Sequence, residues 1–204
     1  MQPRVLAAVL VLASPAGADT LTTTDDPGTI TDIDAGVSEV ALGAMSIVSY
    51  HGEGATSSTR VDLLLSAGYR YFVHPNVSIG GDLLFDQDRT SDTSTSRALG
   101  GAATLTLHER LGFSVFARPT LALGVLFGSR EQDTGMPNLV MQTSQTAFLT
   151  RLQLPLAFYP SHRIVLQAGP ELDLALGTVG EATGRSTGYT TLASGFSFGF
   201  GYVF

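Results

Sequence analysis

The 204-residue sequence has no cysteine, no tryptophan and no lysine, and only 14% of its residues are charged. Without cysteine the chain can form no disulfide bond, no thiolate metal site and no cysteine nucleophile. All 11 basic residues are arginine, and the formal net charge is −7. Nucleic-acid binding requires clustered positive charge, so the composition argues against a nucleic-acid partner.

Long hydrophobic runs are also missing, because no stretch reaches the length of about 18 apolar residues that a membrane-spanning helix requires. Nevertheless 44% of the residues are hydrophobic, which is too many for a disordered chain. The length suits one domain with short tails. Two classes of protein remain, a soluble globular protein and a membrane β-barrel.

The N-terminus has the three parts of a secretory signal peptide. Arg4 supplies a positive charge, Val5 to Ala13 form an unbroken apolar run, and Ala16-Gly17-Ala18 provides a small-residue cleavage site. We therefore predict that residues 1–18 are a cleaved signal peptide rather than a buried first helix. The polar, Thr-rich residues 19–37 show no periodicity and predict a flexible periplasmic lead segment, which precedes a barrel domain at 38–204.

From Ser38 onward the hydrophobic pattern repeats every two residues, which indicates strands. Eight segments follow one another, roughly at 38–50, 60–73, 77–86, 97–108, 112–128, 145–158, 163–177 and 191–204. Tight turns at 74–76, 109–111 and 160–162 alternate with longer connections at 51–59, 87–96, 129–144 and 178–190. This alternation is typical of outer-membrane barrels. It predicts an all-β fold, an eight-stranded antiparallel up-and-down transmembrane β-barrel with short periplasmic turns and longer extracellular loops.

The two faces of each segment differ in polarity. Charged residues concentrate on the faces opposite the apolar ones, which include Glu39, Asp62, Arg70, Asp82, Asp86, Arg118, Arg151, Glu171 and Asp173. A soluble, lipocalin-like barrel would turn the apolar faces inward. An eight-stranded barrel is narrow, so the Gly, Ala and Ser of the charged faces fit its lumen better than Phe and Leu. Aromatic residues near both strand ends also favour the membrane barrel.

Two stretches carry a resemblance to a known family. The last segment contains Phe196, Phe198, Phe200, Tyr202 and Phe204, and RLQLPLAFYPSHRIVLQAGPELDLALG (151–177) contains Leu-Pro-Leu, a turn and Ala-Gly-Pro. With GYRYFVHPNVSIGGDL around the first turn, the chain resembles the small outer membrane protein beta-barrel domain family. The resemblance implies a Gram-negative outer membrane location, surrounded by outer-membrane lipid and lipopolysaccharide. It also implies that Phe200, Tyr202 and Phe204 form the signature read by the barrel-assembly machinery.

The inward charges are the most specific internal feature. Six of them predict a charge network in the lumen: Arg70, Asp82, Arg118, Arg151, Glu171 and Asp173. Burial of unpaired charge is costly, so opposite signs at matched depth favour a structural network over a narrow ion path. Three prolines, at 119, 155 and 170, fall inside predicted strands and predict local bulges.

No catalytic, cofactor or metal site is predicted. His51, Asp86, Asp88, Ser91 and Asp92 lie near one predicted rim, where lipid-modifying barrel enzymes place such groups, but their spacing is not diagnostic. The prediction is a non-enzymatic, monomeric outer-membrane barrel with a role in envelope integrity or surface contact. A narrow, porin-like solute channel and a lipid-modifying enzyme are the alternatives.

The terminal aromatic row generates a first prediction. If Phe204 guides assembly, its deletion should lower the amount of protein in the outer membrane while export continues. Immunoblots of outer-membrane and periplasmic fractions measure both quantities. Unchanged outer-membrane levels would show that Phe204 serves only as part of the apolar surface.

Overall fold

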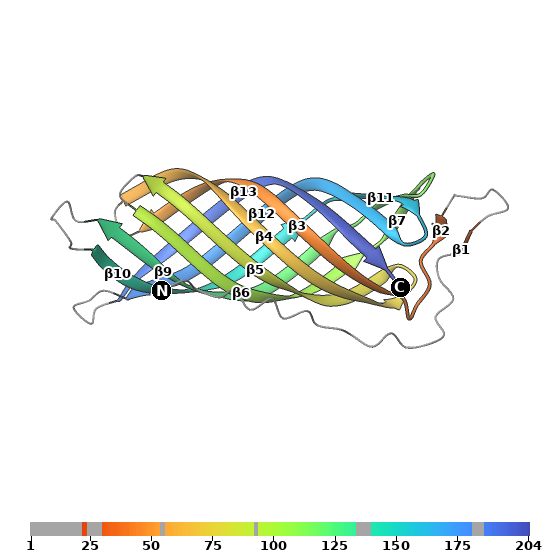
Figure 1. Cartoon of the computed structure of the whole chain (residues 1–204), viewed down its shortest axis with the longest axis horizontal. Helices are drawn as coiled ribbons and strands as arrows, with labels where there is room; N and C mark the ends of the chain where they lie inside the picture. Colours follow the sequence, from red (N-terminus) through yellow and green to blue (C-terminus); the bar gives the residue numbers. More distant parts are fainter. Residues whose placement is uncertain (1–21, 24–29, 54–55, 92–93, 134–139, 181–185) are drawn as a thin grey trace, which may run out of the picture.

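The computed structural model describes residues 22–23, 30–53, 56–91, 94–133, 140–180 and 186–204 (Figure 1). Eight long strands carry the fold: β3 (Ser38–Glu53), β4 (Thr56–His74), β5 (Val77–Ser91), β6 (Ser94–Leu107), β9 (Thr120–Asp133), β10 (Val140–Gln153), β12 (Ile164–Gly180) and β13 (Ser186–Val203). Five short strands accompany them: β1 (Thr22–Thr23), β2 (Ile30–Asp32), β7 (Glu109–Gly112), β8 (Val115–Ala117) and β11 (Leu156–Ser161). Among these residues, no helix is long and apolar enough to cross a membrane.

The long strands form a closed antiparallel ring in the order β3-β4-β5-β6-β9-β10-β12-β13, and β13 pairs with β3. Following paired residues once around the ring from Glu39 leads back to β3 at Ser49, a stagger of ten residues. With strands about 4.8 Å apart and a rise of about 3.3 Å per residue, this stagger tilts the strands by about 40° from the barrel axis. The predicted eight-stranded antiparallel ring is confirmed.

The strands extend further than the sequence pattern predicts at the end of the long connections. The β3–β4 pairing reaches Glu53 and Thr56, and the β5–β6 pairing reaches Ser91 and Ser94. Most of the predicted loops 51–59 and 87–96 is therefore strand, and so are residues 129–133, 140–144, 178–180 and 186–190 of the other two predicted loops, so the boundaries of all four long connections were wrong. Polar Ser and Thr dominate both faces in these stretches, so the pattern of apolar alternation is lost although the backbone pairing continues.

At the opposite end, called the short-turn end, one predicted turn lies elsewhere. The turn between His74 and Val77 occurs where it is expected. Residues 109–111, in contrast, belong to β7, and the hairpin reverses at Phe113 and Ser114, whose φ angles are 46° and 62°. A two-residue turn with positive φ matches the twist of antiparallel strands, which the local sequence, lacking Asn or Gly at those two positions, does not reveal.

Two of the three strand prolines interrupt their strands. The predicted segment 112–128 is broken between β8 and β9 at Pro119, and 145–158 is broken between β10 and β11 at Pro155. The carbonyl oxygens of both prolines still accept backbone hydrogen bonds. The Leu107 amide donates to Pro119 O (2.9 Å) and the Arg118 amide donates to Pro155 O (2.9 Å). Pro170 remains within β12, opposite Phe196. Pro119 and Pro155, which cannot donate to the ladder, therefore interrupt their strands instead of forming the predicted bulges, and no register shift marks a bulge at Pro170.

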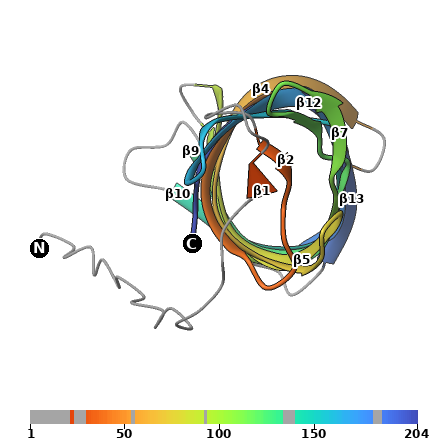
Figure 2. The same cartoon turned by 90° about the vertical axis from the view of Figure 1, so that its right-hand side faces the viewer.

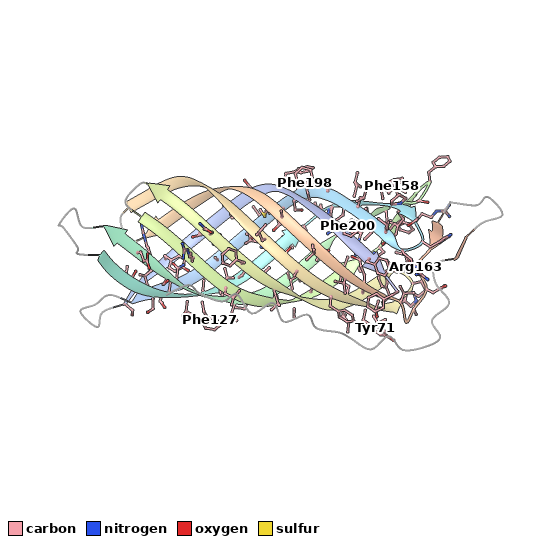
Figure 3. The ribbon with its side chains drawn as sticks, viewed as in Figure 1. Tyr71, Phe127, Phe158, Arg163, Phe198 and Phe200 are labelled. Carbon is pink, nitrogen blue, oxygen red and sulfur yellow. The ribbon has the colours of Figure 1, made fainter. Side chains whose placement is uncertain are left out.

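The outer surface of the barrel is an apolar belt. Large exposed side chains occur on every strand of the ring, and they include Leu42, Leu65, Leu83, Leu99, Leu105, Leu123, Phe127, Phe148, Leu152, Phe158, Leu166, Leu174, Phe196, Phe198 and Phe200. Phe127 and Phe198 point away from the wall in Figure 3. The soluble alternative, with these side chains inside, is therefore wrong for the described residues.

Inside the ring, two apolar clusters fill the lumen. The first, the central cluster, consists of Met45, Leu64, Leu84, Ala98, Ala102, Ala122, Leu126, Ala147, Leu149 and Ala193. The second, the mouth cluster, lies at the short-turn end and consists of Ile33, Val37, Phe72, Phe116, Ala157, Tyr159, Val165 and Val203. Ile33 and Val37 belong to the range predicted as a flexible lead segment, but their side chains are buried.

The belt generates a second prediction, at Leu174 on β12. Its side chain is exposed while that of the preceding residue, Asp173, is buried. Leu174→Arg should lower the free energy of unfolding by about 2–4 kcal/mol if the residue lies near the bilayer midplane. Leu174→Trp should be nearly neutral, because lipid accommodates a larger apolar residue.

Denaturant unfolding in lipid bilayers measures both variants. A packed interior at Leu174 would instead make the Trp variant overpacked, at a cost of about 1–3 kcal/mol. Strong destabilisation by Leu174→Trp would therefore show that the outer and inner faces are assigned the wrong way round.

Candidate functional site in the barrel lumen

Charged side chains from four strands and one strand break meet inside the barrel, where they form two ion clusters. The first, the Glu39 cluster, contains Glu39 from the start of β3, Arg70 from β4 and Arg118 from the break between β8 and β9. Arg70 Nη1 lies 3.2 Å from Glu39 Oε1, and Arg118 Nη2 lies 3.0 Å from Glu39 Oε2. Arg118 Nη1 also donates to Gln167 Oε1 at 3.1 Å. One carboxylate therefore serves two guanidinium groups.

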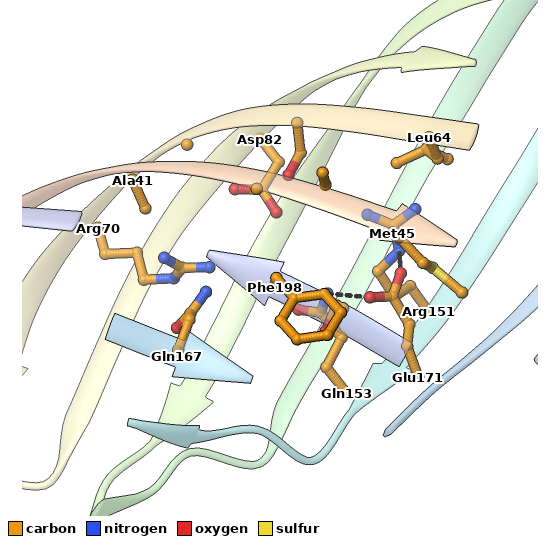
Figure 4. Close-up of a pocket in the computed structure, with 15 residues that line it drawn as sticks. Ala41, Met45, Leu64, Arg70, Asp82, Arg151, Gln153, Gln167, Glu171 and Phe198 are labelled. Atoms are coloured by element: carbon orange, nitrogen blue, oxygen red, sulfur yellow. Dashed lines mark hydrogen bonds and ion pairs between the residues drawn. The ribbon is translucent and has the colours of Figure 1, made fainter. Parts of the chain in front are cut away.

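The second cluster, the Arg151 cluster, reverses that ratio. Arg151 on β10 lies directly opposite Asp173 on β12, and it donates from Nε and Nη2 to the two carboxylate oxygens at 2.9 Å each. Arg151 Nε also lies 2.7 Å from Glu171 Oε1, while Gln153 donates to the other oxygen of Glu171 (Figure 4). One guanidinium group therefore serves two carboxylates, and the fork of Arg suits this bidentate geometry.

Both clusters are almost sealed from solvent. The exposed fraction is 0% for Glu39 and 1% for Arg118 and Arg151. Desolvation of such groups is costly, and it is offset only when each charge keeps a well-placed partner. Removing one partner of a buried ion pair should therefore lower the free energy of unfolding by more than removing one partner of an exposed pair.

Asp82 on β5 lies apart from these pairs. It is 7% exposed, and among the described residues no hydrogen bond or ion pair ties it to Arg70, Arg118 or Arg151. Its carboxylate lies over Gly68, where an added Cβ would come within 2.1 Å of Oδ1. Any residue larger than glycine at position 68 would therefore collide with the Asp82 carboxylate.

A small cavity lies between the clusters, lined by Arg70, Asp82, Arg151, Gln167 and Glu171 among others (Figure 4). Its volume of about 20 Å³ is enough for one or two water molecules. Between the two clusters, the described side chains therefore leave room for only a little water.

All six predicted network residues lie inside the barrel. The structure pairs Arg151 with Glu171 and Asp173, whereas Arg118 pairs with Glu39. Glu39 is the main omission from the predicted network. Its inward direction is visible in the sequence, but as the second residue of its strand it suggests an exposed rim position, and only the stagger of the ring brings it to Arg118.

Other predicted residues lie away from this site. The aromatic rings of Phe200 and Tyr202 are exposed on the outer surface, and the rings of Tyr202 and Phe204 stack with centroids 6.4 Å apart. Arg163 donates to the Tyr202 hydroxyl at 3.2 Å, near the short-turn end (Figure 3). Asp92 and the side chains of His51, Asp88 and Ser91 lie outside the described part of the structure. Within that part, no group of three His, Cys, Asp or Glu residues is placed to hold a metal.

A closed eight-stranded ring with an apolar belt and a lumen filled by side chains is the fold of small outer-membrane β-barrels. No protein-family model and no curated protein matches the sequence. Solved structures do match. The outer membrane protein AlkL, solved in lipid bilayers, aligns over 90% of this chain and 97% of its own, with 15% identity and a TM-score of 0.53. A major outer membrane protein from Thermus thermophilus aligns over 82% and 99%, with 10% identity and a TM-score of 0.52. At these identities the likeness shows the fold.

The Arg151 cluster generates a third prediction. Arg151→Met leaves two buried carboxylates without their cation, and should lower the free energy of unfolding by about 3–5 kcal/mol. Asp173→Asn leaves Arg151 paired with Glu171, and should cost only about 1–3 kcal/mol. Denaturant unfolding in bilayers at neutral pH compares the two.

A triple variant, Arg151→Met with Glu171→Gln and Asp173→Asn, is the matched control. It removes all three charges together and should recover part of the stability lost by Arg151→Met alone. Equal stability of Arg151→Met and Asp173→Asn would indicate that water screens the lumen far more than the burial of these groups implies.

Proposed function

We propose that this chain is an integral outer-membrane β-barrel without enzymatic activity, whose closed lumen gives it a structural or surface-contact role in the cell envelope. The observation that carries the proposal is the combination of an uncharged apolar belt outside with paired, buried charges inside. An open pore would need a hydrated lumen, and a soluble protein would need a polar exterior.

The belt supports the membrane location. Exposed Leu and Phe side chains on all strands of the ring form a continuous apolar surface, which is far larger than the patches that soluble monomers expose. A closed ring leaves no unpaired backbone edge, as a lipid environment requires. The predicted signal peptide, in residues outside the described structure, would provide export, and the aromatic C-terminal strand would provide recognition by the barrel-assembly machinery.

The ion clusters support a closed lumen. Each guanidinium group in them lies 2.7–3.2 Å from at least one carboxylate, and the cavity between them has room for only one or two water molecules. An ion passing this level would have to separate buried pairs, which is costly at low local dielectric. A narrow channel would therefore require a lumen in which these ion pairs are separated and hydrated.

The fourth prediction combines location with conductance. The protein should fractionate with outer membranes and migrate heat-modifiably on gels. After refolding into planar bilayers it should show no steady channel currents. Recovery as a soluble monomer without detergent would contradict the location.

Two controls separate the alternatives. Steady currents that change in Arg118→Ala or Arg151→Ala would replace the closed barrel by the narrow channel. Incubation of the refolded protein with lipopolysaccharide should leave the lipid mass unchanged. A mass change that disappears in His51→Ala would instead support the lipid-modifying enzyme.

A further inference from the structure

The inner wall of the barrel is apolar at the short-turn end, where it forms a socket. Phe72 from β4, Phe116 from β8, Tyr159 from β11, Val165 from β12 and Val203 from β13 all bury their side chains there. Inward-facing apolar groups at an open barrel mouth would contact water. In this structure something covers them, because their exposed fractions are 2% or less.

The cover is the lead segment itself. Ile33 and Val37 are 1% and 0% exposed and pack into the socket. Their backbone is fixed as well: the Gly36 amide donates to the Phe72 carbonyl at 2.7 Å, and the Phe72 amide donates to the Val37 carbonyl at 2.9 Å. Gly36 has a φ of 91°, a conformation that favours glycine. In the view along the barrel, β1 and β2 lie within the outline of the ring (Figure 2).

The covered socket lies directly next to the Glu39 cluster. Only Ser38 separates Val37 from Glu39, and Ser38 exchanges two backbone hydrogen bonds with Phe204, at 3.0 and 2.9 Å. An added Cβ at Gly201 would meet Val165 Cγ1 at 2.4 Å and Glu39 Oε1 at 3.1 Å. The socket wall and the buried carboxylate are therefore neighbours, and the same segment that seals the mouth also carries the acid that binds Arg70 and Arg118.

We propose that residues 30–38 are a resident plug that seals the short-turn mouth of the barrel, and that displacement of Ile33 and Val37 admits water to the mouth and to the Glu39 cluster. This inference goes beyond the proposed function, because it assigns the control of access at one end to one segment. It holds whether or not the barrel conducts ions.

Cysteine accessibility tests the plug directly, because the chain has no cysteine of its own. The reporter is Val165→Cys, whose parent side chain is 0% exposed in the socket. In refolded full-length protein a charged methanethiosulfonate should label it slowly. Adding Val37→Asp should raise the labelling rate by about tenfold or more, because an ionised carboxylate does not stay in an apolar socket.

Matched variants separate plug release from general damage. Ala35→Asp places the same charge on an exposed position of the same segment and should leave Val165→Cys protected. His162→Cys, exposed at the neighbouring turn, should react rapidly in every background. Rapid labelling of Val165→Cys with the native lead segment, or unchanged protection after Val37→Asp, would overturn the proposal.

Amide hydrogen exchange tests the same inference without any substitution, which matters if Val37→Asp fails to refold. The amides of Gly36 and Phe72 both donate across the junction between plug and barrel. Both should exchange on the slow timescale of the barrel strands. Exchange of Gly36 at the rate of an unstructured chain would show that the lead segment is not resident in the mouth.

Discussion

Closure of the ring between β13 and β3 is the constraint on which the rest of the structure depends. Eight strands with a stagger of ten residues enclose a lumen that side chains fill. No backbone group is left at a sheet edge in the ring, so the outer face can be wholly apolar. The same closure brings the inward charges together in a narrow lumen, where Arg70, Arg118 and Arg151 each meet a carboxylate.

The two ion clusters meet this demand in opposite ways. Glu39 binds two arginines, whereas Arg151 binds two carboxylates. The two clusters together hold three carboxylates and three guanidinium groups, so their opposite imbalances cancel. Asp82 adds a fourth carboxylate to the buried charged groups. Buried ion pairs contribute little net stability compared with apolar packing. In this barrel they connect β3 with β4 and with the break before β9, and β10 with β12.

Small residues allow these contacts. An added Cβ at Gly169 would come within 2.4 Å of Pro155 Cα, so glycine lets β12 approach the break between β10 and β11. Arg118 lies in the break before β9, and its amide donates a hydrogen bond to the carbonyl oxygen of Pro155 in the break before β11. The mouth cluster then covers the short-turn end, and the lead segment is part of the packed interior.

Most of the fold follows from the sequence, because the direction of a side chain from a strand is a local property. The alternation of residues such as Asp173 and Leu174 separates lumen from outer surface whatever the neighbouring strands do. Pairing across the lumen is different. Only the tertiary structure decided that Arg118 meets Glu39, that Pro119 and Pro155 break their strands, and that Val37 fills the mouth. These contacts depend on the stagger accumulated over all eight strands, which no local pattern contains.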